Sequence, residues 1–400
     1  MKHRPFTPIA IGLLLCLAGM TVAQKIETVD GVRIVHNEKA GAWGSSSKVE
    51  LKLLRTIGDV DTDDERLAFN APTDIALDAA GNIYILDSGN CRIQKFDREG
   101  KFLMSMGRKG QGPGEFANPT SIDVDSTGFI YAVDSNQSRL VVFKPDGGHL
   151  KSSPTTGVNL GRIRFLKSGL IATRVEGGGI FIKGPGSKPG LPEPPKKLIK
   201  LLDLELNPKV EFGDIFDFKD PMTNQMGNGS QIEVGRDDHI YLAFFYQNRI
   251  EKYAPGGKLL WRADRPLNFS TELMEKGRME ATGNSMSYYS PKMNRCTIGV
   301  SVDSKNRVWV ITMTRQLKTE EQIGVMMSSG PGGVSRKISG NTDLRTTDAY
   351  KLDVFDPDGL LLGSMPIGHF ADGIRIAGDS LFLLDQMRGV KYYQYRILER

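Results

Sequence analysis

Cysteine is scarce in this chain of 400 residues, which contains only Cys16, Cys91 and Cys296. Cys16 lies in an apolar run near the N-terminus, and the two remaining cysteines are too few for a disulfide framework. An excess of charge of one sign is lacking as well, because 52 Lys and Arg residues face 47 Asp and Glu residues. Nucleic-acid binding usually shows a concentrated basic stripe. We therefore expect no nucleic-acid partner and a fold held together by its core.

Long apolar runs are absent apart from one, over residues 9–20. Lys2 and Arg4 precede this run and the small residue Ala23 follows it, which are the parts of a secretory signal peptide. The run is short for a membrane span, although an uncleaved anchor is the alternative interpretation. Removing residues 1–23 lowers the net charge from +5 to +3. We expect an exported protein, periplasmic or extracellular, with no membrane span after cleavage.

Glycine, by contrast, is abundant, and its 45 residues exceed the average share of about 7%. Such a surplus indicates many tight turns. Residues 81–102 read GNIYILDSGNCRIQKFDREGKF, and residues 128–150 read GFIYAVDSNQSRLVVFKPDGGHL. The same step of 47 residues separates Gly81 from Gly128 and relates the other matched positions. A fixed period of this size indicates a repeat architecture.

The repeated unit predicts a meander of four short strands joined by tight turns. In the first copy the strands are expected at residues 72–78, 83–86, 92–96 and 102–106. The second strand is apolar on both faces, so the sheet is expected to lie between two neighbouring sheets. Weaker copies follow at residues 162–212, 238–257, 297–311 resumed at 350–359, and 370–398.

The last copy ends after its third strand, and the missing strand has a candidate near the N-terminus. Residues 49–57 predict a strand that is followed by a loop and Phe-x-x-Pro, as in residues 101–119. This strand can complete the last sheet, which closes a ring and removes a free sheet edge. The expected fold class is therefore all-β: a six-bladed β-propeller of four-stranded antiparallel blades, closed by the N-terminal strand completing the last blade.

The unit P-x-x-I-x-x-D-x-x-G-N-I-Y-x-x-D-x-x-N-x-R-I-x-x-F-x-x-x-G resembles the NHL-repeat family of propellers. The expected organisation is a signal peptide at 1–23, a lead-in at 24–48 and one propeller domain at 49–398. Insertions are expected near residues 177–197, 265–295 and 318–347. The resemblance is specific for fold and says little about function. It implies that ligands bind near the central channel, on the face where the innermost strands begin.

An Asp and an Arg recur five residues apart, as Asp87 with Arg92 and as Asp134 with Arg139. A catalytic pair need not be copied blade by blade, whereas a charge-assisted hydrogen bond that pins a turn would be. We interpret both as structural turn pairs.

Small polar and acidic residues occupy the expected strand starts at the channel mouth. The ligand-binding candidates are Thr73, Asp74, Thr120, Ser121, Ser230, Gln231 and Asp372. They lack the apolar lining of a typical ligand pocket, so the alternative is that they only solvate the channel mouth. No catalytic constellation is recognisable among them, and catalytic residues remain unassigned.

A metal-dependent hydrolase or lyase with its site at the central channel is the alternative function. A zinc lyase would need histidines at the strand starts, and only His369 of the five histidines is well placed. Calcium would need several carboxylate and amide oxygens, and Asp372 is the candidate ligand, with Asp74 as a second. Because this set is incomplete, we expect no cofactor, with calcium as the alternative.

Two insertions stand out: residues 265–295 contain NSMSYYSPKMNR, which is rich in Met and Tyr, and residues 318–347 contain GVMMSSGPGGVSR. Long loops on a rigid scaffold are common binding elements, and such side chains suit protein or sugar contacts. The alternative is a disordered or lid-like excursion. The expected function is a non-catalytic binding module for a protein, peptide or glycan partner. A monomer is expected.

Overall fold

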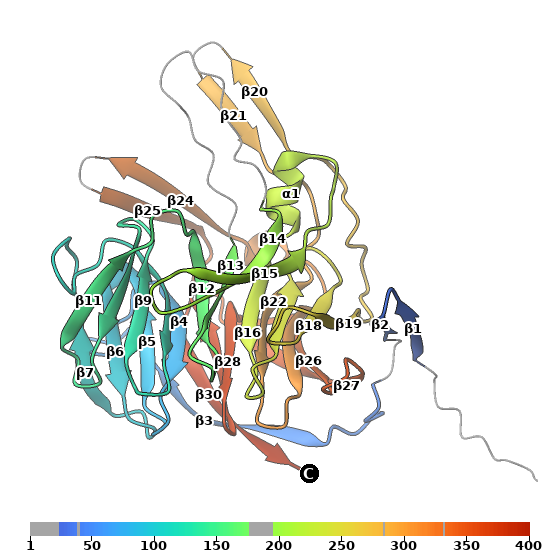
Figure 1. The fold of residues 1–400 in the computed structure, drawn as a ribbon, viewed down its shortest axis with the longest axis horizontal. Coiled ribbons are helices and arrows are strands. Elements are labelled where there is room, and N and C mark those ends of the chain that lie inside the picture. Colours follow the sequence, from blue (N-terminus) through green and yellow to red (C-terminus); the bar gives the residue numbers. More distant parts are fainter. Residues whose placement is uncertain (1–23, 38–40, 176–194, 283–284, 331–332) are drawn as a thin grey trace, which may run out of the picture.

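The computed structural model describes residues 24–37, 41–175, 195–282, 285–330 and 333–400. The predicted signal peptide and most of the insertion near 177–197 lie outside these ranges. The expected fold is confirmed: six blades of four antiparallel strands form a β-propeller, and two further strands extend the sheet of one blade (Figure 1). Within the described residues, no helix is long and apolar enough to cross a membrane.

The first three blades follow one another along the chain, each with its strands in sequence order. Blade 1 consists of β4 (Pro72–Leu77), β5 (Ile83–Asp87), β6 (Arg92–Phe96) and β7 (Phe102–Met106), with the short 3-10 turn η1 (Ser88–Asn90) between β5 and β6. Blade 2 consists of β8 (Pro119–Val124), β9 (Ile130–Asp134), β10 (Arg139–Phe143) and β11 (His149–Pro154). Blade 3 consists of β12 (Leu160–Phe165), β13 (Ile171–Val175), β14 (Lys197–Leu202) and β15 (Pro208–Asp214).

The later blades carry the additions to the basic pattern. Blade 4 consists of β16 (Ser230–Val234), β17 (Ile240–Phe244), β18 (Ile250–Tyr253) and β19 (Leu259–Ala263), preceded by α1 (Pro221–Gly227). Blade 5 consists of β22 (Thr297–Val302), β23 (Val308–Met313), β26 (Thr346–Phe355) and β27 (Leu361–His369). Blade 6 consists of β28 (Gly373–Ala377), β29 (Ser380–Asp385), β30 (Lys391–Glu399) and β3 (Val49–Ile57). Strand β3 pairs antiparallel with β30, so the N-terminal strand closes the ring as predicted.

Tight turns between the first and second strands depend on residues that tolerate a positive φ. Gly81 and Gly128 have φ of +84° and +88° in blades 1 and 2. Asp238 and Asn306 take the same place in blades 4 and 5, with φ of 62° and 59°. Asp and Asn are the non-glycine residues that enter the left-handed region most readily. The weaker copies therefore keep the turn although they lose the glycine.

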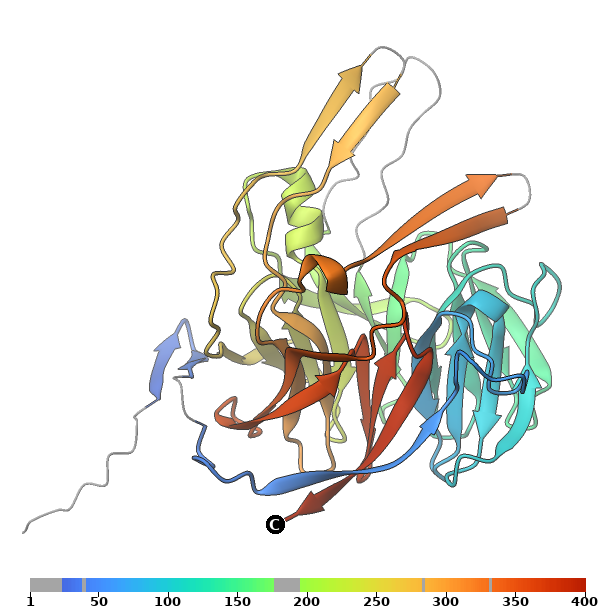
Figure 2. The same cartoon turned by 180° about the vertical axis from the view of Figure 1, so that it is seen from behind.

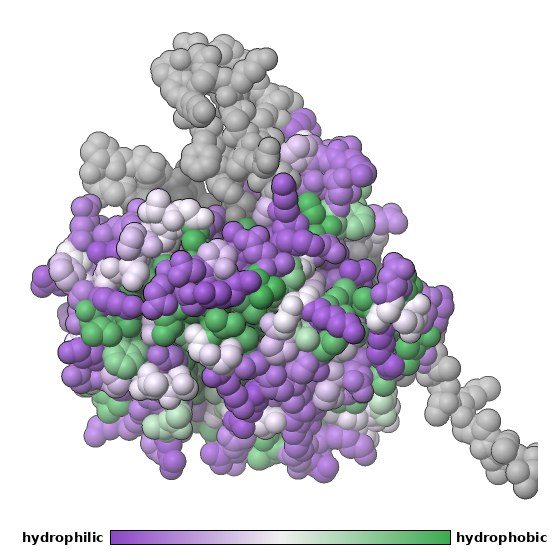
Figure 3. Space-filling model, in the orientation of Figure 1, coloured by the Kyte–Doolittle hydropathy of each residue, from purple (hydrophilic) through white to green (hydrophobic). Residues whose placement is uncertain are grey.

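The hydrophobic core is divided among the blade interfaces. Six clusters of buried apolar residues are found among the described residues, each between two neighbouring blades. Strands β5 and β9 are buried along their whole length, because both of their faces contact another sheet. This is the packing that their continuous apolar sequences predict. Figure 3 shows hydrophilic and hydrophobic residues interspersed over the visible outer face of the blades.

The pair formed by Asp87 and Arg92 lies in the turn between β5 and β6 and holds the loop that enters the blade. Arg92 Nε donates to Asp87 Oδ2 at 2.8 Å, and Asp87 Oδ1 accepts the backbone N–H of Asn70 at 2.7 Å. Arg92 Nη2 also donates to the carbonyls of Glu65 and Ala68. The pair thus fixes the blade entry loop to the turn.

Blade 2 repeats this arrangement with a longer ion pair. The carboxylate of Asp134 accepts the backbone N–H groups of Ala117 and Asn118, and Arg139 Nη2 donates to the carbonyl of Glu115 at 2.6 Å. The Arg139 Nε to Asp134 Oδ2 distance is 3.7 Å, too long for a direct hydrogen bond. Both pairs therefore connect consecutive blades, and the arginine bonds to the entry loop are common to both.

A hairpin of β1 (Lys25–Val29) and β2 (Val32–His36) extends blade 4 at its outer edge, where β2 pairs in parallel with β19. The side chain of Asn37 donates to the carbonyls of Asp264 and Gly359 and accepts the N–H of Leu361. The lead-in thus joins blade 4 to blade 5 (Figure 2). His36 Nδ1 lies 2.6 Å from Asp264 Oδ2 and fixes the end of this hairpin.

The attachment of β1 and β2 is expected to weaken as pH rises. The hydrogen bond to Asp264 raises the pKa of His36 above 6.5, against a smaller effect of burial. A raised folded-state pKa stabilises the folded state fully below the unfolded value, and this contribution is lost as pH rises through the folded value. Hydrogen exchange of residues 32–37, corrected for intrinsic rates, should therefore be faster relative to the blades at pH 8.5 than at pH 6. His36→Gln should abolish the difference, and an equal pH response in that variant would contradict this role.

Candidate functional site

At three blade junctions, between blades 1 and 2, 2 and 3, and 5 and 6, side chains of one innermost strand accept backbone N–H groups of the next blade. At these junctions the side chains cover backbone groups that the edge of an innermost strand would otherwise leave unpaired. The bonds run from Ile122 N to Asp74 Oδ2, Ile163 N to Ser121 Oγ, Phe165 N to Asp123 Oδ2 and Ile376 N to Ser301 Oγ, with lengths of 2.8–3.1 Å. Short polar side chains in the innermost strands therefore hold the ring together at the axis.

Six charged side chains meet around the same axis, from five different blades. Their members are Asp74, Asp123, Arg162, Arg164, Glu233 and Arg375, and we call this set the axial charge network. Arg164 donates to both oxygens of Asp74, at 3.0 and 3.1 Å, and Arg162 Nη1 lies 3.0 Å from the same carboxylate. Arg375 Nη1 binds both oxygens of Glu233, at 2.6 and 2.8 Å, and its Nη2 reaches Asp123 at 3.2 Å.

The axial charge network is largely buried and balanced in charge. Three carboxylates face three guanidinium groups, and Asp74 and Arg164 are each only 1% exposed. Burial alone would raise the pKa of Asp74, but Arg162 and Arg164 outweigh it and hold that pKa well below its usual range. Burial raises the pKa of Asp123, with Arg375 and Arg164 acting in the opposite direction. The axis is therefore filled by the protein's own charges.

The predicted channel-mouth residues fall into two groups in the structure. Asp74 and Ser121 are buried in the axial network, where Ser121 Oγ donates to Asp74 Oδ2 at 2.8 Å. Ser230 is buried and accepts from Arg174 Nε. Gln231 is buried, and its Nε2 has no hydrogen-bond partner among the described residues.

The remaining candidates lie nearer to solvent. Thr73 is half-buried and its hydroxyl contacts that of Ser88, whereas Thr120 and Asp372 are exposed. Asp372 accepts the backbone N–H of Gln386 at 2.9 Å. The structure thus does not bring the seven candidates into one cluster of shared contacts.

Calcium does not fit these residues. Asp74, one of the two proposed ligands, is surrounded by guanidinium groups, and Asp372 is not in its network. No group of three or more His, Cys, Asp or Glu side chains suited to a metal occurs among the residues that the structure describes. Calcium usually needs six to eight oxygen ligands. His369, the best placed histidine for zinc, instead stacks on Tyr393 and lies 2.9 Å from the hydroxyl of Tyr395.

Calcium is accordingly expected to leave the stability of the protein unchanged. A metal that binds the folded state would raise the melting temperature in proportion to the logarithm of its concentration. Addition of millimolar calcium, compared with a chelator, should shift the melting temperature by less than about 1 °C. A larger calcium-dependent rise in melting temperature that disappears in Asp372→Ala would contradict this expectation and support a calcium site at Asp372.

Two hairpins project from one end of the propeller. Strands β20 (Arg278–Thr282) and β21 (Ser285–Tyr289) lie between blades 4 and 5, and β24 (Ile323–Gly330) and β25 (Gly333–Gly340) lie within blade 5. Both project on the same side of the molecule in both views, with α1 beside the base of the first (Figures 1 and 2). Their connections leave the blades at the end where the innermost strands begin. We call this end the insertion face.

The base of β20–β21 is fixed to the structure below it. Glu275 and Lys292 pair through their backbones and through a side-chain ion pair of 3.0 Å. Gly277 approaches α1 so closely that a Cβ there would lie 2.3 Å from the sulfur of Met222. The N–H of Gly277 also donates to the hydroxyl of Thr223. This hairpin therefore starts from a packed base.

The base of β24–β25 is held by a buried carboxylate. Glu321, in the 3-10 turn η2 (Thr319–Glu321), accepts two bonds from Arg315, at 2.6 and 2.7 Å, and one from Thr347 at 2.8 Å. The side-chain hydrogen bond from Arg315 is the main cause that lowers the pKa of Glu321 to about 2. Arg388 of blade 6 donates to the carbonyl of Glu321. The hairpin is thus anchored to two blades.

Sequence reasoning missed most of the axial network and found only Asp74 of its six charges. A signal was present, because Arg-Ile-Arg-Phe, Gln-Ile-Glu-Val and Gly-Ile-Arg-Ile each place an ionisable residue among apolar neighbours in an innermost strand. In strands that are otherwise buried, such a residue needs a charged partner. The partners come from blades that are far apart in the sequence, so the sequence does not show which charged residues pair with one another.

Comparison with known proteins supports the fold. A family described as a 6-bladed beta-propeller, DUF5128, matches residues 27–159, which span the lead-in, β3 and blades 1 and 2. A DUF4221 family member from Bacteroides vulgatus superposes with a TM-score of 0.55 at 12% identity, covering 88% of this chain and 99% of the other. A protein from Bacteroides fragilis, described as a candidate exported protein, gives 0.54 at 13% identity, covering 92% and 99%. No curated protein matches the chain. At these identities the structural matches show the fold alone.

Proposed function

We propose that this protein is an exported, non-catalytic NHL-type propeller that binds a protein, peptide or glycan partner on its insertion face. Two independent points support export: the signal-like residues 1–23 and the similarity to a B. fragilis protein described as a candidate for export. A metal-dependent hydrolase or lyase has less support, because Asp74 is ion-paired with arginines and no metal-ligand group is found among the described residues.

The observation that carries the proposal is the anchored pair of hairpins. A two-stranded hairpin is marginally stable on its own, so one that projects from a scaffold needs a fixed base. Here Glu321 and the contact of Gly277 with α1 supply it. Among the described strands, none pairs with the outer edges of β20–β21 or β24–β25, and an extended peptide can add to such an edge as a further strand.

Exposed apolar side chains support the same surface. Ten large hydrophobic residues are exposed among those described, and three of them lie in the insertions. These three are Met274, Tyr289 and Ile338, which are 40–54% exposed. Aromatic and methionine side chains are enriched where protein surfaces bind partners. The insertion face thus offers both strand edges and apolar contacts.

Shortening the hairpins is expected to weaken partner binding by at least about tenfold, because both strand edges and apolar anchors are removed. Residues 276–291 can be replaced by Asn-Gly, which joins the paired positions Glu275 and Lys292 through a two-residue turn. Residues 324–339 can be replaced in the same way between Ile323 and Gly340. The intact mature chain is first used to capture the partner from the exported proteins of the organism that produces this chain. The affinity of each shortened variant for that partner is then measured.

A surface change at the other end of the propeller serves as the control. Lys144→Ala alters the turn between β10 and β11 and should leave binding unchanged. If both shortened variants fold and bind the partner as tightly as the intact chain, the insertion face is not the binding surface.

A further inference from the structure

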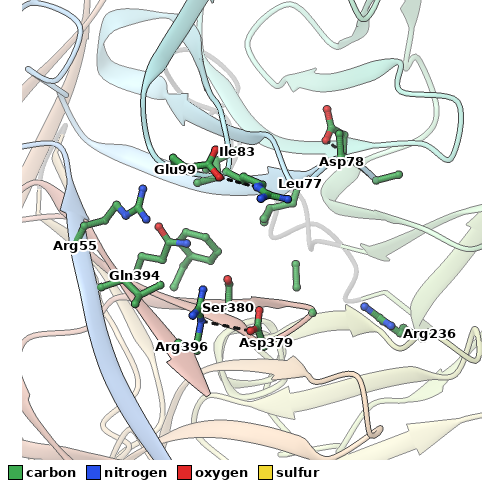
Figure 4. A pocket seen from close by; sticks show the side chains of 18 residues that line it. Arg55, Leu77, Asp78, Ile83, Glu99, Arg236, Asp379, Ser380, Gln394 and Arg396 are labelled. Atoms are coloured by element: carbon green, nitrogen blue, oxygen red, sulfur yellow. Dashed lines mark hydrogen bonds and ion pairs between the residues drawn. The ribbon is translucent and has the colours of Figure 1, made fainter. Parts of the chain in front are cut away.

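An unassigned pocket of about 650 Å³ opens at the end of the propeller opposite the insertion face. It is formed by the turns that follow the innermost strands of blades 1 and 6, at residues 78–81 and 377–380, together with β3 and β30. Because neighbouring strands run antiparallel, these turns lie at the other end from the strand starts. Arg236 enters from the corresponding turn of blade 4, so the pocket borders the axis (Figure 4). Its volume is within the range of small-molecule sites.

Arginines dominate the charge of this pocket. Arg55, Arg98, Arg236 and Arg396 line it, against the three acids Asp78, Glu99 and Asp379. Figure 4 shows Arg55 and Arg236 on opposite sides of the pocket. The apolar side chains of Leu77, Ile83 and Phe382 complete its wall.

The three acids do not neutralise Arg55 and Arg236, because each acid is engaged elsewhere. Asp78 is used by its own turn, where its carboxylate accepts from the backbone N–H groups of Ala80 and Asn82 and from the hydroxyl of Tyr84. Glu99 pairs with Arg98 at 2.7 Å, and Asp379 pairs with Arg396 at 3.5 Å.

Both of these pairs are more than half exposed, and exposed pairs of this kind hold their partners weakly. A bound anion can therefore compete with Glu99 for Arg98 or with Asp379 for Arg396.

The side chains of Arg55 and Arg236 have no hydrogen-bond or ion-pair partner within the part of the chain that the structure describes (Figure 4). Arg55 is half-buried and packs on the turn at Gly100, where a Cβ would lie 3.0 Å from its Cδ and Nη1. Its guanidinium group is thus positioned without a carboxylate. Guanidinium forks bind carboxylate, sulfate and phosphate groups through paired hydrogen bonds.

We propose that this pocket binds a small polar molecule with two anionic groups, one held by Arg55 and the other by Arg236. Gln394 and Ser380 line the space between and supply amide and hydroxyl groups for the neutral part of the ligand. An acidic or sulfated disaccharide has this chemistry. The site is independent of the partner surface, because the two lie at opposite ends of the propeller.

Calorimetric titration of the mature chain with digalacturonate and with a disulfated disaccharide tests the proposal and separates carboxylate from sulfate ligands. At least one of them should bind, and binding should weaken with added salt. Arg55→Gln and Arg236→Gln should each weaken it by roughly tenfold or more, the value of a charged hydrogen bond. Arg108→Gln makes the same charge change at an arginine that is 82% exposed and outside the pocket, and should have no effect.

The competing outcomes are distinct. Absence of binding by both disaccharides, equal binding of neutral lactose, or affinity that neither pocket substitution changes would overturn the proposal. Binding of inorganic phosphate as tightly as the disaccharides would also overturn it, because one anionic group would then suffice. The hairpin-shortened variants should bind these ligands normally, so failure of the partner surface does not affect this test.

Discussion

Arg164→Leu is expected to lower the free energy of unfolding by about 3–5 kcal/mol. The substitution leaves three carboxylates at the axis with two guanidinium groups, and Asp74 and Glu233 are both nearly inaccessible to solvent. An uncompensated buried charge is among the largest single destabilising effects known in proteins. Chemical denaturation at pH 7.5 measures the change. Arg108→Leu, at an exposed position, should change the free energy by less than about 0.5 kcal/mol.

The same variant should recover part of its stability in acid. A buried carboxylate that has lost its partner has a folded-state pKa above its unfolded value, so protonation favours the folded state as pH falls. The deficit of Arg164→Leu relative to the original chain should therefore be smaller at pH 4.5 than at pH 7.5. A deficit that is constant with pH, or below about 1 kcal/mol, would show that Arg164 acts only by filling space.

Asp87→Ala is expected to destabilise the protein by about 2–3 kcal/mol. The fully buried carboxylate accepts from Asn70 N, Asn90 Nδ2 and Arg92 Nε, and its removal leaves these three partly buried donors without that acceptor. Burial raises the pKa of Asp87 against the effects of Asn70 and Arg92. We therefore attribute the contribution of Asp87 to stability to these hydrogen bonds.

A double-mutant cycle of Asp87→Ala and Arg92→Ala isolates the pair. We expect a coupling free energy of about 1 kcal/mol or more, because the two side chains share a bond of 2.8 Å. Blade 4 shows what replaces the pair, since Phe244 takes the place of the Asp and Arg249 lies 3.7 Å above its ring. Strictly additive effects of the two substitutions would contradict a pairing role.

The fold could be predicted because its determinants are local and repeated. The 47-residue step, the positive-φ glycines at Gly81 and Gly128 and the apolar second strands each specify part of a blade. Ring closure followed from the missing fourth strand, and β3 supplies it by pairing with β30. These features belong to short segments, so a sequence shows them directly.

Other features depend on contacts between distant segments. Arg375 pairs with Glu233 across 142 positions, and Asn37 bonds to Leu361 across 324. No local pattern specifies either pairing. For the same reason, the lead-in could not be recognised as the hairpin β1–β2, which extends blade 4. The pocket with Arg55 and Arg236 unites turns of three blades, and its residues look like ordinary surface positions in the sequence.

The most direct test of the binding proposal is a hydrogen-exchange footprint of the complex between the mature chain and its captured partner. The account predicts protection at β20–β21, β24–β25 and α1, with the turns at residues 144–147 and 377–380 unchanged. Protection confined to those turns or to the outer strands of the blades, with both hairpins exchanging as in the free protein, would contradict it.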